Sequence, residues 1–158
     1  PSLMGKPKCR IADEVVELRD IMPTLLDVAG LSIPDNVDGK SLLPVMQGVN
    51  QDWRLYIHGE HCTCYSREQE MQFVTNGKRK FIWFPRTGIE QFFDLSRDPG
   101  ELHNLIKNPE RQDEINIWRS YLIYELDQRD CGWIKNGNLY CPQDSPLVSP
   151  YKDKRWLG

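Results

Sequence analysis

Long hydrophobic runs are absent from this sequence, and so is an excess of basic residues. No stretch approaches the roughly 20 consecutive apolar residues that a membrane-spanning helix requires, so we expect no membrane partner. Lys and Arg number 20 against 23 Asp and Glu, which gives a formal net charge of −3. Proteins that bind nucleic acids through the phosphate backbone need a basic surface, so we expect no nucleic-acid partner either.

Cysteine is scarce and odd in number. The five thiols are those of Cys9, Cys62, Cys64, Cys131 and Cys141. At least one of them stays unpaired within a single chain, and the sequence has no Asn-x-Ser/Thr glycosylation site, so both features lean toward a reducing compartment. The first residues lack an initiator methionine and the apolar core of a signal peptide, and we expect the chain to be a piece of a longer protein.

Hydrophobic residues make up 39% of the 158 residues and charged residues 27%, the composition of a globular domain. Apolar residues at helical spacing predict a helix over residues 20–29, with Asp20 as its N-cap and Gly30 as the residue that ends it. A shorter helix over residues 41–46 follows. Residues 11–19 are a mixed run that predicts a strand or an extended arm.

The middle of the chain predicts antiparallel strands. Residues 53–61 alternate like a strand, and residues 71–75 and 80–84 flank Asn76-Gly77, a pair that fits both positive-φ positions of a type I′ hairpin turn. Another strand follows at residues 90–95. We therefore expect a small antiparallel sheet of three to four strands.

A long helix is predicted after the strands. Asn108 is its N-cap with Pro109 in the first turn, and Gly132 ends it. Its apolar stripe consists of Ile115, Trp118, Leu122 and Leu126. Packed on one face of the sheet, this helix gives a two-layer fold of the α+β class.

Three segments, in this order, resemble the sulfatases of the alkaline-phosphatase-like superfamily. Asp20–Gly30 is similar to their D-(I/L)-x-P-T-(I/L)-L-(D/E)-(L/M)-A-G segment, and Asp38–Pro44 with Gly48 resembles D-G-x-S-L-x-P-x-x-x-G. Phe93–Glu101 with Asn104-Leu105 matches (F/Y)-D-L-x-x-D-P-x-E-x-x-N-L. The three segments in this order, with a hairpin between the second and third, make the resemblance specific.

The resemblance implies that the parent protein hydrolyses sulfate esters. Sulfatases use a formylglycine made from the Cys or Ser of C-x-P-x-R, and a calcium ion that holds the sulfate. In the family these groups lie upstream of the region seen here, so we expect no catalytic residue, metal or cofactor in this chain and no activity from the chain alone.

The resemblance also implies a division of the chain. Residues 1–50 correspond to the last strand and helix of a truncated α/β domain, and residues 51–132 to the C-terminal antiparallel sheet plus helix. Residues 133–158 read as an extended tail with prolines and spaced aromatic residues. Exposed aromatic side chains are costly, so we expect the tail to dock on the parent protein or on a neighbouring subunit.

A short segment superficially resembles the formylglycine motif. Cys64-Tyr-Ser-Arg67 lacks the proline of C-x-P-S-R, and Glu68 stands where the arginine is required. We therefore expect no formylglycine at Cys64.

The densest cluster of chemical groups is His58-Gly-Glu-His61-Cys-Thr-Cys64. Zinc binding is one alternative, but a strand sends His58 and His61 to opposite faces. In sulfatases the C-terminal domain contributes polar residues to the rim of the cleft, so we predict His61, His58 and Arg67 as substrate-binding candidates. His61 is preferred because it stands where strand and loop meet. Hydrogen bonding within a domain interface is the open alternative for both histidines.

Arg86 stands in a predicted loop beside the strands, where an arginine could meet an anionic substrate, but we expect it to be solvated. His103 is expected to be a surface residue. Two other functions stay open. A phosphonate monoester or phosphodiester hydrolase of the same superfamily would act on the same tetrahedral anion geometry, which the C-terminal domain does not discriminate. A free-standing, non-catalytic interaction module is the second, and a helix with no sheet to cover argues against it.

Overall fold

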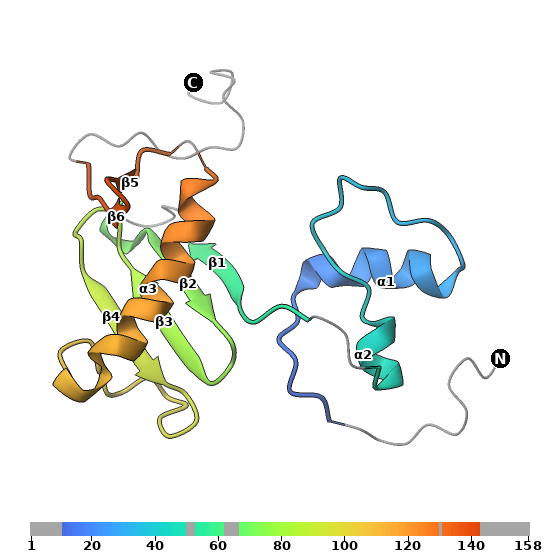
Figure 1. The fold of residues 1–158 in the computed structure, drawn as a ribbon, viewed down its shortest axis with the longest axis horizontal. Helices are drawn as coiled ribbons and strands as arrows, with labels where there is room; N and C mark the ends of the chain where they lie inside the picture. Colours follow the sequence, from blue (N-terminus) through green and yellow to red (C-terminus); the bar gives the residue numbers. More distant parts are fainter. Residues whose placement is uncertain (1–10, 50–52, 62–66, 130, 143–158) are drawn as a thin grey trace. The chain divides into compact units, whose positions relative to one another are not determined.

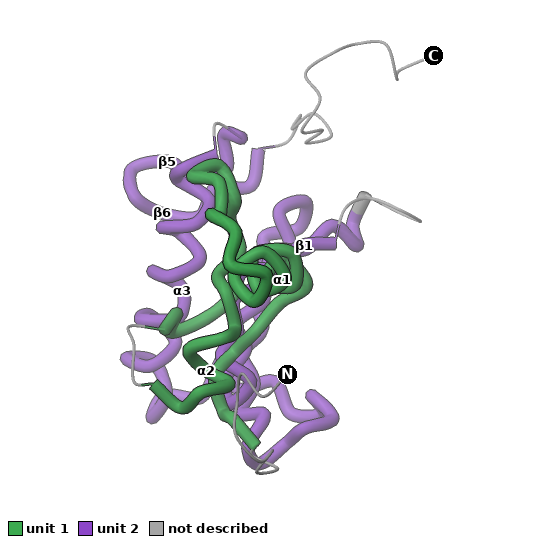
Figure 2. Tube along the Cα trace, turned by 90° about the vertical axis from the view of Figure 1, so that its right-hand side faces the viewer, with its two compact units in different colours: residues 1–57 green, residues 58–158 purple. Residues whose placement is uncertain are grey.

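The computed structural model describes residues 11–49, 53–61, 67–129 and 131–142. The chain divides into two compact units, residues 1–57 (unit 1) and residues 58–158 (unit 2), which Figure 2 draws in different colours. The boundary lies after Ile57, later than residue 50, where the sequence predicted the end of the first segment.

The described residues of unit 1 contain three short helical elements: η1 (Leu18–Asp20), α1 (Ile21–Val28) and α2 (Leu43–Gln47). The predicted helix over residues 20–29 is confirmed by α1. Gly30 follows the end of the helix and has a φ of +71°, as expected for the residue that ends it. The second predicted helix is confirmed by α2, which ends at Gly48. Of the two alternatives for residues 11–19, no strand forms, and the last part of that segment belongs to the 3-10 helix η1.

Asp20 ties the segments of unit 1 together. Its side chain is fully buried, and its two oxygens accept hydrogen bonds from the backbone N–H groups of Lys40 and Glu17, each at 2.9 Å. Arg54 donates to both oxygens at 2.7 Å. The N-cap position predicted for Asp20 is correct, but its carboxylate does not cap α1 and instead joins three separate parts of the unit.

Gly39 has no room for a side chain. A Cβ atom at this position would collide with the backbone carbonyl of Arg19. The close approach lets the next residue, Lys40, bring its N–H to the carboxylate of Asp20. This packing gives a physical reason for the Asp-Gly pair in the second of the three sequence segments.

Unit 2 is built on a four-stranded sheet in the order β1-β2-β3-β4 (Figure 1). The strands are β1 (Ile57–His61), β2 (Met71–Thr75), β3 (Arg79–Trp83) and β4 (Glu90–Asp94), and η2 (Arg67–Gln69) precedes β2. The pairings of β2 with β3 and of β3 with β4 are antiparallel. The small antiparallel sheet is therefore confirmed, although its first strand begins at Ile57 and not at Trp53.

The turn between β2 and β3 differs from the predicted type. Gly77 has a φ of +78°, but the only non-glycine residues with positive φ in the part of the chain that the structure describes are Glu101 and Asn136. The side chain of Asn76 instead accepts hydrogen bonds from the N–H groups of Lys78 and Arg79, at 3.0 and 2.9 Å. This side-chain turn keeps Asn76 out of the left-handed region, so the type I′ assignment is wrong.

Helix α3 (Gln112–Asp127) lies across one face of the sheet (Figure 1). It follows η3 (Pro109–Arg111), where Asn108 accepts the N–H of Glu110 at 2.9 Å, as predicted for the N-cap. The helix ends before the predicted Gly132. The buried core is formed by the sheet residues Val74, Phe81, Trp83 and Phe92 and by the helix residues Ile115, Trp118, Leu122 and Leu126. The two-layer α+β fold is thus confirmed.

Asn104 and Leu105 run along β4, which is a terminal strand in the sheet order. The N–H of Leu105 donates to the carbonyl of Phe92 at 2.8 Å, and Asn104 Oδ1 accepts the N–H of Phe92 at 3.0 Å. Both bonds satisfy backbone groups that an open sheet edge would leave unpaired. The Asn-Leu pair that closes the third sequence segment therefore covers a sheet edge.

The first part of the predicted extended tail is folded. β5 (Ile134–Lys135) and β6 (Asn138–Leu139) form a hairpin around Asn136 and Gly137, whose φ values of +53° and +72° are those of a two-residue type I′ turn. Trp133 is buried and meets Trp83 edge to face, with ring centroids 6.0 Å apart. The extended description is therefore wrong for residues 133–142, and residues 143–158 lie outside the described part of the chain.

Candidate functional site

The His58-Gly-Glu-His61 segment forms most of β1, so its side chains alternate between the two faces of the sheet. His58 and Glu60 both contact Gln72 of β2, and Arg129, which follows α3, contacts both of them. These contacts place His58 and Glu60 on the face that α3 covers. Gly59 and His61 therefore belong to the opposite face.

His58 is engaged by its neighbours. Its Nε2 lies 2.8 Å from Gln72 Oε1, and its Nδ1 lies 3.2 Å from a guanidinium nitrogen of Arg129. Burial and the positive charge of Arg129 together lower the pKa of His58, so the neutral imidazole is favoured. Sequence analysis missed Gln72 and Arg129, which lie 14 and 71 residues from His58, because no local pattern joins them.

His61 differs from His58 in that one of its ring nitrogens lacks a partner. The Nδ1 atom is buried, and it has no hydrogen bond within the part of the chain that the structure describes. Buried polar atoms of this kind are rare in folded proteins and call for a specific explanation. The hydrogen-bonding capacity of this nitrogen is therefore unused among the described residues.

Gly59 shares a face of β1 with His61, two residues further along the strand. Its missing side chain lets the ring of Phe73 lie across the strand. A Cβ atom on Gly59 would come within 2.7 and 2.8 Å of the Cε1 and Cε2 atoms of Phe73. Real Cβ atoms do not approach carbon so closely, so only glycine fits beneath the ring. Glycine at position 59 therefore leaves room for the Phe73 ring on the face of β1 that also carries His61.

Gly59→Ala is expected to lower the free energy of unfolding of the chain by about 1–3 kcal/mol, because the ring of Phe73 must move. Thermal or urea unfolding followed by circular dichroism measures this loss. Gly100→Ala is the matched control, since its new Cβ would meet Leu102 Cγ at an ordinary 3.4 Å. Equal effects of the two substitutions would contradict the close-packing explanation, and Phe73→Leu should recover part of the loss in Gly59→Ala.

The third predicted candidate, Arg67, begins η2, and its side chain lies outside what the structure describes. Cys62 and Cys64, and with them most of the formylglycine-like segment, also lie outside the described residues. No group of three or more His, Cys, Asp or Glu side chains is placed to hold a metal ion among the described residues. The zinc alternative involves Cys62 and Cys64, so it is not tested by the described residues.

The expectation that Arg86 is solvated is wrong. Its Nε donates to Glu70 Oε2 at 2.6 Å, and both side chains are at most 9% exposed. His103 is on the surface as predicted, with its side chain 79% exposed and its Nδ1 3.5 Å from Asp98. Cys131 and Cys141 form no disulfide, and the Cys141 thiol donates to the carbonyl of Pro85.

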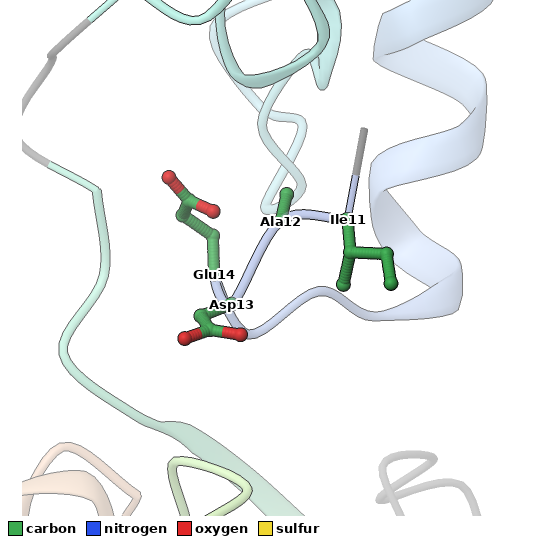
Figure 3. A pocket seen from close by; sticks show the side chains of 4 residues that line it. All are labelled: Ile11, Ala12, Asp13 and Glu14. Atoms are coloured by element: carbon green, nitrogen blue, oxygen red, sulfur yellow. The ribbon is translucent and has the colours of Figure 1, made fainter. Parts of the chain in front are cut away.

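A pocket in unit 1 lies along the segment from Ile11 to Glu14 (Figure 3). The side chains of Asp13 and Glu14 bring two carboxylates to it. Like charges repel, so this pocket is unsuited to an anionic ester.

Among the described helices, none is long and apolar enough to cross a membrane.

Comparison with known proteins relates the chain to hydrolases. The family model described as N-sulphoglucosamine sulphohydrolase, C-terminal, matches residues 3–128. An arylsulfatase from Clostridium perfringens is 47% identical over 87% of this chain and 28% of its own length. Arylsulfatase K from Homo sapiens is 34% identical over 99% of this chain and 28% of its own length.

Solved structures agree on the fold. A 2-O GAG sulfatase matches 81% of this chain and 30% of its own with a TM-score of 0.65 at 25% identity. The phosphonate monoester hydrolase of Agrobacterium radiobacter matches 69% of this chain and 24% of its own with a TM-score of 0.55 at 25% identity. The chain thus spans less than a third of the length of each of these relatives. It belongs to the sulfatases, and residues 3–128 correspond to the C-terminal domain of that family.

Proposed function

We propose that this chain is the C-terminal part of an enzyme that hydrolyses sulfate esters. The observation that carries the proposal is the match of residues 3–128 to a sulphohydrolase C-terminal domain, together with 47% identity to an arylsulfatase. In this proposal the formylglycine nucleophile and the calcium ion belong to the larger part of the parent enzyme. This chain supplies the sheet-and-helix domain and part of the substrate rim.

Within the chain, His61 is the residue that we assign to the substrate. Its buried Nδ1 lacks a partner among the described residues, and an imidazole N–H can donate to a sulfate or leaving-group oxygen. His58 is a poorer candidate, because both of its ring nitrogens already have neighbours. Arg67 comes shortly after His61 in the sequence and is a second candidate, because a guanidinium binds oxyanions well.

The apolar surface of α1 supports the assignment of unit 1 to a larger domain. Leu18 of η1 and Ile21, Leu25 and Val28 of α1 repeat at helical spacing, and each is between 44% and 84% exposed. Thr24 and Asp27 on the helix instead bond Leu42 and Ser41 within unit 1. An exposed stripe of this kind normally packs against another element. We propose that it packs against the large α/β domain of the parent enzyme.

The proposal is tested by assaying the full-length protein and the 158-residue chain on an aryl sulfate and on an aryl phosphonate monoester. The full-length protein is expected to turn over the sulfate ester with the higher kcat/KM. The isolated chain is expected to show no turnover, because in this proposal the nucleophile and the calcium ion belong to the larger part of the parent enzyme, and no group of three or more His, Cys, Asp or Glu among the described residues is placed to hold a metal ion. Turnover of the aryl sulfate by the isolated chain would contradict the assignment.

The same assay decides between the two hydrolase functions. Preference of the full-length protein for the phosphonate monoester would favour the alternative that the structural match to a phosphonate monoester hydrolase suggests. Absence of turnover on either ester would point to a non-catalytic interaction module.

A further inference from the structure

Four side chains close a ring of contacts at the edge of the sheet. His58 Nε2 lies 2.8 Å from Gln72 Oε1, and Gln72 Nε2 donates to Glu60 Oε2 at 3.3 Å. Arg129 completes the ring, with one nitrogen 2.7 Å from Glu60 Oε2 and the other 3.2 Å from His58 Nδ1. This His58 clasp (His58, Glu60, Gln72 and Arg129) joins β1, β2 and the segment after α3.

The ring is consistent with one protonation state of His58. A guanidinium only donates, so Nδ1 of His58 must accept from Arg129. The amide nitrogen of Gln72 donates to the carboxylate of Glu60, so its oxygen faces His58, and Nε2 of His58 must carry the hydrogen. A second proton on Nδ1 would set two donors and two positive charges against each other 3.2 Å apart. The clasp therefore requires neutral His58.

The clasp acts on the strand that carries His61. β1 is the first strand in the sheet order and has five residues, and β2 is its one neighbour in that order. Gln72 is 1% exposed, so the ring is anchored on a side chain that packing holds in place. His61 is the last residue of β1, on the face opposite the clasp.

We propose that His58 is a positioning residue, which as a neutral imidazole fastens β1 to Gln72 and Arg129 and thereby fixes the place of His61 at the substrate. This inference rests on the proposed function of His61. Because Nδ1 of His58 no longer accepts from Arg129 once it is protonated, the ring opens at Arg129 and the place of His61 depends on pH.

The direction of the pH dependence follows from the groups that face His58. Burial and Arg129 lower its pKa, and they outweigh the opposing influence of Gln72, Glu125 of α3 and Glu60. Since the pKa in the folded chain lies below the unfolded value of about 6.5, the clasp is complete above that pH and is lost as the pH falls through the lower value.

The first test is an NMR titration of the imidazole groups in the ¹⁵N-labelled 158-residue chain. The chain has three histidines, so the signal of His58 is one of three to be assigned. We expect His58 to be the Nε2–H tautomer and to titrate below the ordinary histidine value of about 6.5. Arg129→Met should raise the titration midpoint of His58. An Nδ1–H tautomer, or a midpoint of His58 that Arg129→Met does not move, would overturn the clasp.

The second test separates positioning from mere structure in the full-length enzyme. The wild-type kcat/KM for an aryl sulfate should fall as the pH drops through the pKa of His58, which lies below the ordinary value of about 6.5. His58→Gln keeps a donor toward Gln72 without a titrating ring, so this variant should keep more activity at pH 5 relative to pH 7 than the wild type does. His58→Ala should lose about tenfold in kcat/KM at pH 7, as expected for a misplaced contact residue. His103→Gln should reproduce the wild-type profile.

A wild-type pH dependence in His58→Gln would refute the positioning role even if His58→Ala failed to fold. The two proposals fail separately. Absence of sulfatase turnover with the expected titration of His58 would refute the proposed function and, with it, the positioning role, but would leave the clasp intact. Sulfatase turnover together with a His58 titration midpoint that Arg129→Met does not move would refute the clasp alone.

Discussion

Replacement of His61 by alanine in the full-length enzyme is expected to lower kcat/KM for a sulfate ester by about 10- to 100-fold. This range corresponds to the roughly 1.5–3 kcal/mol that a hydrogen bond to a charged group contributes. The buried Nδ1 of His61 has no partner among the described residues, so the substitution breaks no hydrogen bond of that atom within them. The loss should therefore appear in catalysis more than in folding, and steady-state kinetics measures it.

Two variants control this experiment. His103→Ala removes an imidazole that is 79% exposed and should leave kcat/KM unchanged. His61→Asn places an amide oxygen or nitrogen close to the position of Nδ1 and should retain more activity than His61→Ala. Thermal unfolding of each variant checks that the fold is kept. A folded His61→Ala enzyme with wild-type kcat/KM would leave only the hydrogen-bonding role at a domain interface.

Elements whose signals are local were predicted well. Helices α1 and α3 were found because their apolar residues repeat over several turns and because Asn108 and Gly30 mark their ends. The turn after β2 was placed correctly, but its type was wrong, because the Asn76 side chain competes for backbone N–H groups. The hairpin at Asn136-Gly137 was overlooked because each of its strands has two residues, too few to show alternation.

The candidate site was predictable only in part. Strand periodicity placed His58 and His61 on opposite faces, and the structure gives them different surroundings. The partners of His58 come from β2 and from beyond α3, and the partner of Arg86, Glu70, lies 16 residues away. Such contacts depend on which elements the fold brings together, and a single sequence carries no local trace of them.

Asp20→Ala is expected to lower the stability of unit 1 by about 3–5 kcal/mol, the cost of removing one partner from a buried ion pair. The change leaves Arg54, whose side chain is 12% exposed, without the carboxylate that it contacts at 2.7 Å. It also removes the acceptor for the N–H groups of Lys40 and Glu17. Native-state hydrogen exchange at these two amides measures the effect as a large loss of protection.

The matched control is Asp38→Ala, two residues from Lys40. Asp38 is 79% exposed and its contact with Arg19 is 3.7 Å long, so its removal should cost at most about 1 kcal/mol.

The pH dependence of amide protection gives a second measure of the role of Asp20. Burial alone would raise the pKa of Asp20, but hydrogen bonds from Arg54 and from the amides of Lys40 and Glu17 outweigh it and lower that pKa. The stabilisation is therefore complete above the unfolded pKa of about 3.9 and is lost as the pH falls through the folded value, so Asp20→Ala should flatten the acid loss of protection. Protection that is equal in both variants at neutral pH would show that the carboxylate of Asp20 does not hold unit 1 together.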